Sequence, residues 1–260
     1  MDKYVNVCYK NNFIKQVIFR IDFLRYVTPD VIFSNELENA IVKFYPQKGK
    51  DQIMRFNAIN LVFDKNVSGI PSANGQSIEG LQKEYSTNNG NKVILSNMFV
   101  AFEINKYTIF DELMKCIKDI LYILFKSGIV IAKRSGLRYI NMFETNRFKL
   151  QKRYFNNDIS STLITKQTPK EESLCLIRSM HTNEYRIENA KLNFRYGMYN
   201  PEYPNCLRDN SFVLDYDCFS EEAFENADQI LRFIEFAHGR IQELFESSIS
   251  QSLRQVMDNE

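Results

Sequence analysis

Alternating apolar and polar positions predict β-strands along much of the chain. Between Phe13 and Phe23 every second residue but one is apolar, whereas Arg20 and Asp22 fall on the opposite face, as a half-buried strand requires. Alternation and strand-forming residues predict further strands over residues 55–64, 81–86, 92–105, 129–143, 173–180, 185–196 and 211–218. These strands predict a largely antiparallel sheet.

Apolar residues three and four positions apart predict helices between these strands. The first covers residues 35–44 and ends before a proline. The second begins near Thr108, where we expect the hydroxyl of Thr108 and the carboxylate of Asp111 to cap it, and it ends at Gly128. A short helix is expected around residues 150–154.

The longest predicted helix begins with a Ser220 cap and continues almost to Val256. At 1.5 Å per residue such a helix would span about 50 Å. This length exceeds one face of a small sheet. We therefore expect its distal part, after Gly239, to pack on the other half of the chain or to form a homo-oligomer.

The segment from Asn66 to Gly80 combines glycine, proline, serine and asparagine, which cannot build a core. It is typical of an exposed hairpin connection or a flexible loop. Its length is compatible with a functional flap or with a loop that the fold simply tolerates.

The order of strands followed by a long helix occurs twice. The residues at 97–100 before one helix are similar to those at 210–213 before the other, which indicates an internal duplication or a convergent strand–turn–helix order. We predict an α+β fold, with a mainly antiparallel sheet in two related halves. The halves are residues 1–147 and 148–260, each covered by a long helix and packed as one unit.

Charge and composition narrow the classes of partner. The 260 residues include 33 basic and 32 acidic side chains, so no net field draws the chain to extended nucleic acid or to an anionic membrane. No window approaches the ~18 apolar residues of a membrane-spanning helix, and the N-terminal residues do not form the apolar core of a signal peptide. We expect a cytoplasmic protein.

The cysteines and histidines predict no metal or redox site. The cysteine number is odd and the spacing wide, which fits neither a disulfide framework nor a zinc motif, so we expect reduced thiols. Of the two histidines, His181 is predicted at a turn and His238 in the apolar stripe of the last helix, as a hydrogen-bonded and partly buried residue. No cofactor is expected. The cysteines are Cys8, Cys116, Cys175, Cys206 and Cys218.

The strand at residues 129–143 contains a candidate anion site. Strict alternation puts Arg134, Gly136 and Arg138 on one face, so two arginines flank a residue without a side chain. Such a gap can admit a carboxylate or phosphate. Alternatively, Gly136 makes room for a crossing helix while the arginines pair with acids such as Asp22 or Glu144.

Asp215 and Asp217 form a second candidate site. They lie two residues apart on a predicted strand, so both carboxylates point the same way and offer oxygen ligands to Mg²⁺. The alternative is the polar face of an edge strand next to a helix cap. Phosphoryl chemistry would require this acidic pair and the arginine strand to share a cleft.

A third candidate is the aromatic segment from Tyr196 to Pro204. It combines three tyrosines, Tyr196, Tyr199 and Tyr203, with glycine and two prolines. Tyrosines supply large contact area with little loss of entropy, as at protein interfaces. The segment is therefore either a partner-recognition surface or a rigid loop that covers a sheet edge.

Three segments together resemble a sporadically distributed family of uncharacterised bacterial proteins of about 260 residues. They are Lys10-Asn11-Asn12 leading into Val17-Ile18-Phe19, the strand containing Gly-Leu-Arg-Tyr-Ile-Asn at 136–141, and Leu214-Asp215-Tyr216-Asp217. The resemblance spans nearly the whole chain. It implies a cytoplasmic bacterial protein without an established enzymatic role, found with defence or mobile-element loci, and it implies no catalytic residues.

These observations predict a non-enzymatic recognition or regulatory module of a bacterial stress or phage-defence system. Its partner would be a protein or a small anionic ligand, bound by Arg134, Arg138 and the three tyrosines, because no nucleophile–base pair is discernible. The alternative is an enzyme, metal-dependent or not, that acts on a phosphorylated or nucleotide ligand. Its polar centre would then be Arg134, Arg138, Asp215 and Asp217.

Overall fold

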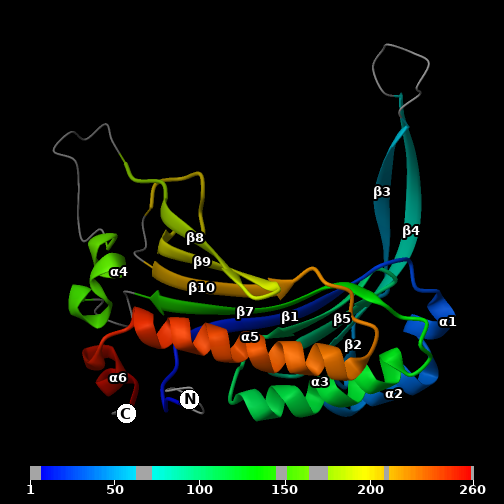
Figure 1. Ribbon diagram of the computed structural model, residues 1–260, viewed down its shortest axis with the longest axis horizontal. Helices are drawn as coiled ribbons and strands as arrows, with labels where there is room; N and C mark the ends of the chain where they lie inside the picture. Colours follow the sequence, from blue (N-terminus) through cyan, green and yellow to red (C-terminus); the bar gives the residue numbers. More distant parts are fainter. Residues whose placement is uncertain (1–6, 63–71, 145–150, 164–174, 208–210, 259–260) are drawn as a thin grey trace.

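Ten antiparallel strands form one sheet in the computed structural model, which describes residues 7–62, 72–144, 151–163, 175–207 and 211–258 (Figure 1). The strands are β1 Ile14–Phe23, β2 Gln47–Lys48, β3 Gln52–Val62, β4 Ser72–Ser86, β5 Lys92–Ser96, β6 Phe99–Ile104, β7 Ala132–Glu144, β8 Ser179–Ile187, β9 Ala190–Tyr199 and β10 Ser211–Ser220. The helices are α1 Pro29–Ile32, α2 Asn35–Phe44, α3 Phe110–Phe125, the 3-10 turn η1 Lys152–Tyr154, α4 Asn157–Ser161, α5 Ala227–Ser248 and α6 Gln251–Asp258. The predicted α+β class is confirmed.

The strand order is β2-β4-β5-β6-β1-β7-β10-β9-β8, and β3 pairs with β4 beside this path. The predicted boundary near residue 147 lies outside the described residues. Strand β7 precedes this boundary in the sequence and β10 follows it, and the two strands pair continuously from Ser135–Ser220 to Glu144–Ser211. Both parts of the chain therefore contribute to one sheet, and the internal duplication stays a prediction.

The two longest helices lie on the same side of the sheet (Figure 1). Helix α5 contacts β7 and β10, and α3 contacts α2 and α5. Helix α5 has a buried apolar stripe, in which the residues recur at helical spacing: Ile230, Ile234, Ala237 and Ile241. Among the described residues, no helix lies on the other face of the central strands in this view.

The predicted strand over residues 92–105 is wrong as a single element. The chain reverses at Asn97 and Met98, so that β5 and β6 pair as a hairpin. The Asn97 side chain is fully buried, accepts a hydrogen bond from the Leu81 backbone at 2.8 Å and donates one to the Val27 carbonyl at 2.6 Å. These two bonds satisfy the buried amide at the point where the chain reverses.

The predicted loop over residues 66–80 is partly a strand. Residues 72–80 belong to β4, which pairs with β3 from Gln52–Gln82 to Val62–Ser72. The remaining residues of this prediction lie outside the described part of the chain. The polar composition reflects a hairpin that projects away from the body of the molecule (Figure 1) and does not have to build a core.

The predicted caps of both long helices are wrong. Helix α3 begins after Ile109 without a side-chain cap, and the Thr108 hydroxyl bonds to the Glu112 carboxylate instead of capping a backbone N–H. Helix α5 begins after Asn226, whose side chain accepts from the Gln229 backbone at 3.0 Å. Ser220 is the last residue of β10. The stop at Gly128, which has a φ of 67°, is confirmed.

The last predicted helix is two helices, because the chain leaves the helical path at Ile249. There it forms an antiparallel bridge with Phe155. The Ser250 backbone donates to the Tyr154 carbonyl at 2.8 Å, and the Asn156 backbone donates to the Ser248 carbonyl at 3.0 Å. The segment at η1 therefore ends α5, and α6 continues beyond it.

The strands at residues 173–180 and 185–196 are displaced from their predicted positions. Strand β8 runs through His181, and the turn to β9 lies at Glu188, which has a φ of 51°. The prediction of His181 at a turn is therefore wrong. Its ring stacks on Tyr196 across the ladder, with centroids 5.3 Å apart. No helix in the described ranges has the length and apolar character needed to cross a membrane.

Candidate functional site

Strand β7 sends its side chains alternately to the two faces of the sheet, as predicted. Leu137 is fully buried and Tyr139 is 5% exposed on the face of α5. Arg134 and Arg138 point to the opposite face, where their side chains are 28% and 32% exposed. We call this second face the open face. It presents charged groups to solvent above an apolar layer.

The gap at Gly136 is filled by a neighbouring side chain. A Cβ atom at Gly136 would lie 3.3 Å from both terminal nitrogens of Arg134 and 3.2 Å from the Cβ of Phe219. The Arg134 guanidinium lies 4.6 Å from the centre of the Phe219 ring and 3.5 Å from the Asp22 carboxylate. Glycine makes room for this arginine, so the space predicted for an anion between the two arginines is occupied.

Arg138 and Asp215 form a bidentate ion pair across β7 and β10. The Nε and Nη2 atoms of Arg138 each lie 2.7 Å from one carboxylate oxygen. Arg195 on β9 contacts the same carboxylate at 3.4 Å and Asp217 at 3.8 Å. Burial raises the pKa of the Asp217 carboxyl, and the surrounding arginines oppose this shift.

The predicted magnesium ligands are therefore engaged by arginines. Asp215 and Asp217 do point the same way, and Arg195 contacts both. Glu221, which the sequence places near them, instead pairs with Lys191 at 2.7 Å. The described residues contain no group of three or more side chains that could hold a metal ion.

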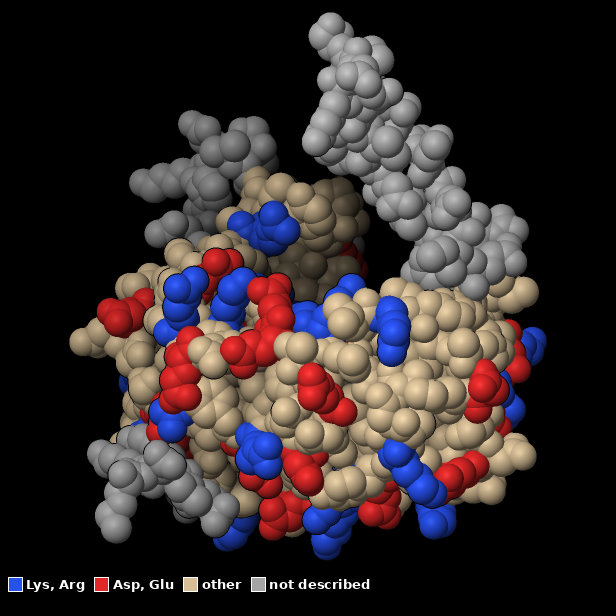
Figure 2. All heavy atoms as spheres, turned by 45° about the vertical axis from the view of Figure 1, so that its right-hand side comes forward, with Lys and Arg blue, Asp and Glu red and all other residues tan. Residues whose placement is uncertain are grey.

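A groove of about 1100 Å³ lies on the open face beside this ion pair. Its floor comes from the central strands β1, β7 and β10, and its wall comes from β8, β9 and the loop after β9. Figure 2 shows a hollow above the body of the protein, with both basic and acidic side chains at its edge. The lining residues used below are Lys15, Arg138, Ile140, Met142, Arg178, Arg195, Tyr199, Asn200, Tyr203, Val213 and Asp215.

Positive charge exceeds negative charge in this groove. Among the described residues that line it, four are basic and one, Asp215, is acidic. Asp215 contacts both Arg138 and Arg195, and Arg195 also contacts Asp217, so two carboxylates balance these two guanidinium groups. The exposed Arg178 adds a further positive charge from the wall. A concave surface lined by low-dielectric walls focuses the field of the charges that line it.

Two of the three predicted tyrosines line the groove. Tyr199 and Tyr203 are 41% and 53% exposed on its wall. The Arg178 guanidinium lies 4.8 Å from the centre of the Tyr203 ring, a cation–π distance. Tyr196 points to the covered face and stacks on Phe194 with centroids 4.8 Å apart. The groove thus brings together residues from all three predicted sites, namely Arg138, Tyr199, Tyr203 and Asp215. Its described lining does not include Arg134, Tyr196 or Asp217.

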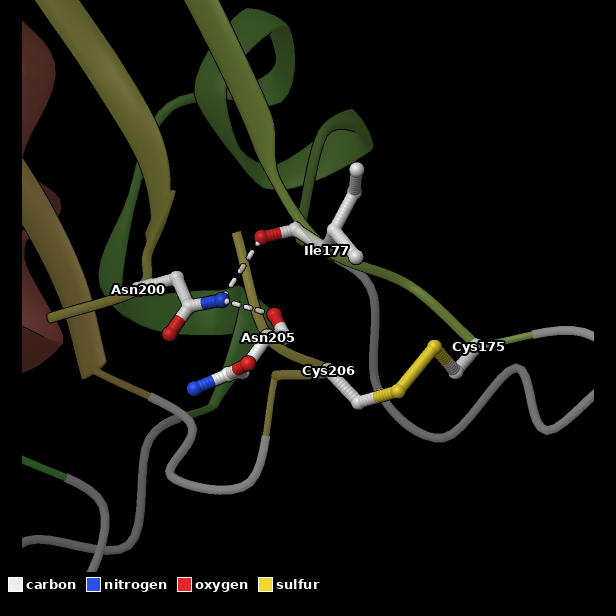
Figure 3. The surroundings of a disulfide bond; sticks show 5 residues. All are labelled: Cys175, Ile177, Asn200, Asn205 and Cys206. Carbon is white, nitrogen blue, oxygen red and sulfur yellow. Dashed lines mark hydrogen bonds between the residues drawn. A yellow bond between two sulfur atoms is a disulfide. The ribbon is translucent and has the colours of Figure 1, made fainter. Parts of the chain in front are cut away.

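The loop that carries Tyr203 is fixed by a disulfide bond, which corrects the prediction that all cysteines are reduced. Cys175 and Cys206 are joined although 31 residues separate them. The neighbouring Asn200 amide donates to the carbonyl oxygens of Ile177 and Asn205, both at 2.8 Å (Figure 3). The prediction relied on an odd number of cysteines. It failed because two of the five are brought together by the β8–β9 hairpin.

Gly197 allows the close approach of β8 and β9 next to this loop. Its φ is 146°, and a Cβ atom there would lie 2.1 Å from the carbonyl oxygen of Ser179. No other residue type fits this position without moving the backbone. The glycine of the predicted aromatic segment therefore helps to place the groove wall.

His238 lies on the covered face, hydrogen-bonded and partly buried as predicted. Its Nδ1 atom is 3.1 Å from the Tyr139 hydroxyl, and its ring stacks on Phe110 with centroids 3.9 Å apart. Burial lowers the pKa of His238 to about 4, so the imidazole is neutral at neutral pH. These residues line a smaller cavity of about 220 Å³ that also includes Tyr107.

The sequence did not single out Lys15, Arg178 or Arg195. Arg195 occupies a polar position between buried Phe194 and Tyr196, and this alternation could have indicated that it faces solvent. Arg178 lay within a predicted strand whose bounds differ from those of β8. The chain matches no family model and none of the curated proteins with which it was compared. The functional case therefore depends on the groove itself.

Proposed function

We propose that the protein is a recognition module that binds a small anionic ligand in the groove on the open face, without converting it. The observation that carries this proposal is the meeting of Arg138, Arg178 and Arg195 with the exposed rings of Tyr199 and Tyr203 in one groove. Arginines bind carboxylates and phosphates through their planar guanidinium groups, and exposed tyrosines offer flat apolar contact area.

The ligand that fits this combination carries both an anionic group and an aromatic ring. Ile140, Met142 and Val213 contribute apolar surface to the groove, which a simple inorganic ion would not use. A nucleotide has phosphates for the arginines and a base that stacks on tyrosine. We therefore favour a mononucleotide over a peptide. The balanced charge of the whole chain argues against a long polyanion.

The second candidate function is an enzyme acting on a phosphorylated ligand. The observation in its favour is that Asp215 and Arg138 line the same groove, which phosphoryl chemistry would require. Against it, Asp215 is held by two arginines and Asp217 is outside the lining residues, so neither carboxylate is arranged to bind Mg²⁺. Recognition without turnover is the better supported function.

Calorimetric titration of the full chain with ATP, pyrophosphate and adenosine tests the proposal. We expect ATP to bind most tightly, because only ATP offers both the phosphates and the base. Equal affinity for ATP and pyrophosphate would show that the base does not contact the tyrosines. No binding of any phosphate compound would contradict the proposed function.

The enzyme alternative is tested by incubating the protein with ATP and Mg²⁺ and measuring phosphate release. We expect no turnover above that of the protein-free control. Turnover that requires Mg²⁺ and disappears in Asp215→Asn would establish the enzyme instead. The Asp119→Asn variant is the matched control, because it removes the same charge at an exposed residue of α3 on the covered side.

The wider setting of this function is proposed from the sequence. The resemblance to uncharacterised bacterial proteins favours a cytoplasmic regulatory role in stress or phage defence, with the bound ligand as a signal. A protein partner and a homo-oligomer remain part of this proposal. For the oligomer the distal α5 residues and α6 are the surface to test, since α6 has a buried stripe and an exposed one.

A further inference from the structure

The disulfide lies next to two residues of the groove wall, Arg178 and Tyr203. Arg178 follows Cys175 by three residues, and Tyr203 precedes Cys206 by three residues. The guanidinium of Arg178 lies over the ring of Tyr203, so the two halves of this contact come from the two segments that the disulfide joins. The covalent bond thus closes the wall of the groove.

Hydrogen bonds between described residues also hold these two segments together. The β8–β9 ladder ends at the pair Ser179–Met198. Beyond it, the Asn200 amide bonds to the Ile177 carbonyl, and the Leu207 backbone donates to the Leu176 carbonyl at 2.7 Å. The segment 175–178 is largely exposed, so little apolar burial fixes it. Among these contacts the disulfide is the covalent restraint on the wall.

We propose that Cys175 and Cys206 are a redox-active pair that controls the affinity of the groove for its anionic ligand. In the disulfide state Arg178 and Tyr203 are held in place for binding. In the dithiol state the two segments separate, and the ligand must order them again at a cost in affinity. This inference rests on the proposed function, because it names the regulation of the same groove.

The chemistry is thiol–disulfide exchange with a small thiol such as glutathione. A glutathione thiolate attacks one sulfur, the protein S–S bond breaks, and a mixed disulfide and one protein thiolate form. A second glutathione thiolate then displaces the remaining protein sulfur. Two glutathiones are oxidised to glutathione disulfide, and the two protein thiolates take up the two protons. Reoxidation is the reverse reaction with glutathione disulfide.

The two buried cysteines, Cys116 and Cys218, are poor competitors for this reaction. Both Cys175 and Cys206 are exposed to solvent, as access by a small thiol requires. Burial raises the pKa of Cys116 to about 11 and that of Cys218 to about 12, so neither forms a thiolate near neutral pH. Cys8 is exposed but is not disulfide-bonded. A disulfide in a reducing compartment is typically transient or regulatory, which fits this role.

The test measures ATP affinity of the full chain by calorimetry in glutathione disulfide and in reduced glutathione, with thiol titration of each state. We expect three reactive thiols in the oxidised protein after denaturation, five in the reduced protein, and roughly tenfold weaker ATP binding on reduction. Cys175→Ser should bind ATP as weakly as the reduced protein in both buffers. Cys8→Ser should respond like the wild type.

Hydrogen exchange gives a second readout that needs no ligand. We expect the Leu207 and Glu202 amides, which donate to Leu176 and Asn200, to exchange faster after reduction. Unchanged exchange, five thiols in the oxidised state, or equal ATP affinity in both states would each overturn the redox inference. Failure of the oxidised protein to bind ATP would contradict the proposed function itself, even if exchange responded to reduction.

Discussion

The two faces of strand β7 have the same backbone and opposite roles. On the covered face Leu137 and Tyr139 are buried against the helix layer. On the open face Arg134 and Arg138 pair with aspartates and remain partly exposed. Burial of apolar area stabilises a fold far more than partly exposed ion pairs do. The covered face therefore provides stability, and the open face is available for recognition.

The His238–Tyr139 pair of the covered face differs in charge from the ion pairs of the open face. On the covered face His238 and Tyr139 are neutral and satisfy each other by a hydrogen bond. On the open face charged and uncharged polar groups line the groove, and the arginines among them outnumber the acids. A neutral hydrogen-bonded pair suits a core, whereas an excess of one charge suits an anionic ligand.

The largest difference between the faces should appear in stability. Leu137→Ala should lower the free energy of unfolding by roughly 2–5 kcal/mol, because a buried side chain leaves a cavity. Arg138→Ala should cost less, about 1–3 kcal/mol, since Arg195 still contacts the Asp215 carboxylate. Urea denaturation measures both changes. A larger loss for Arg138→Ala than for Leu137→Ala would reverse the assignment of the faces.

The next effect concerns the pH dependence of stability. The pKa of His238 is lowered to about 4 in the folded state, against an ordinary value of 6.5. The unfolded chain therefore binds a proton first as the pH falls, and stability is lost between pH 6.5 and about 4. The loss should not exceed about 3 kcal/mol.

The control for this pH effect is His238→Gln, whose amide can also bond to the Tyr139 hydroxyl. The variant should lack the part of the slope between pH 6.5 and 4 that belongs to His238. Equal slopes for variant and wild type, measured by urea denaturation at each pH, would show that the imidazole is not held neutral on the covered face.

The smallest effect is expected for an exposed ion pair of the open face. Arg134→Gln removes the contact with Asp22 at 3.5 Å and should cost about 0.2–1 kcal/mol. Because Arg134 does not line the groove, ATP affinity should stay within about twofold of the wild type. A loss comparable to that of Leu137→Ala would show that open-face charges are essential to the fold.

Local patterns in the sequence were sufficient for the alternation of β7 and for helix α2, which lies at Asn35–Phe44 as predicted. Such features depend on neighbours within a few residues. The end of α5 depends instead on a bridge between Ile249 and Phe155, and the reversal at Asn97 depends on Val27. These contacts join distant parts of the chain, so no local period could indicate them.

The candidate site was predictable residue by residue but not as an assembly. The sequence singled out Arg138, Asp215, Tyr199 and Tyr203 separately. Arg138 and Asp215 are 77 positions apart and meet only because β7 pairs with β10. The strand order decides which candidates share a groove, and it follows from long-range pairing that the alternation of apolar residues does not encode.

The most direct test removes the same amount of charge from each face and compares ATP binding. One double variant, Arg178→Gln with Arg195→Gln, lowers the charge of the groove, and the other, Lys115→Gln with Lys118→Gln, lowers that of exposed α3 positions by the same amount. Calorimetry should show at least about tenfold weaker binding for the groove variant, and near wild-type affinity for the α3 variant. Equal losses in the two variants, or a greater loss in the α3 variant, would contradict a ligand site on the open face.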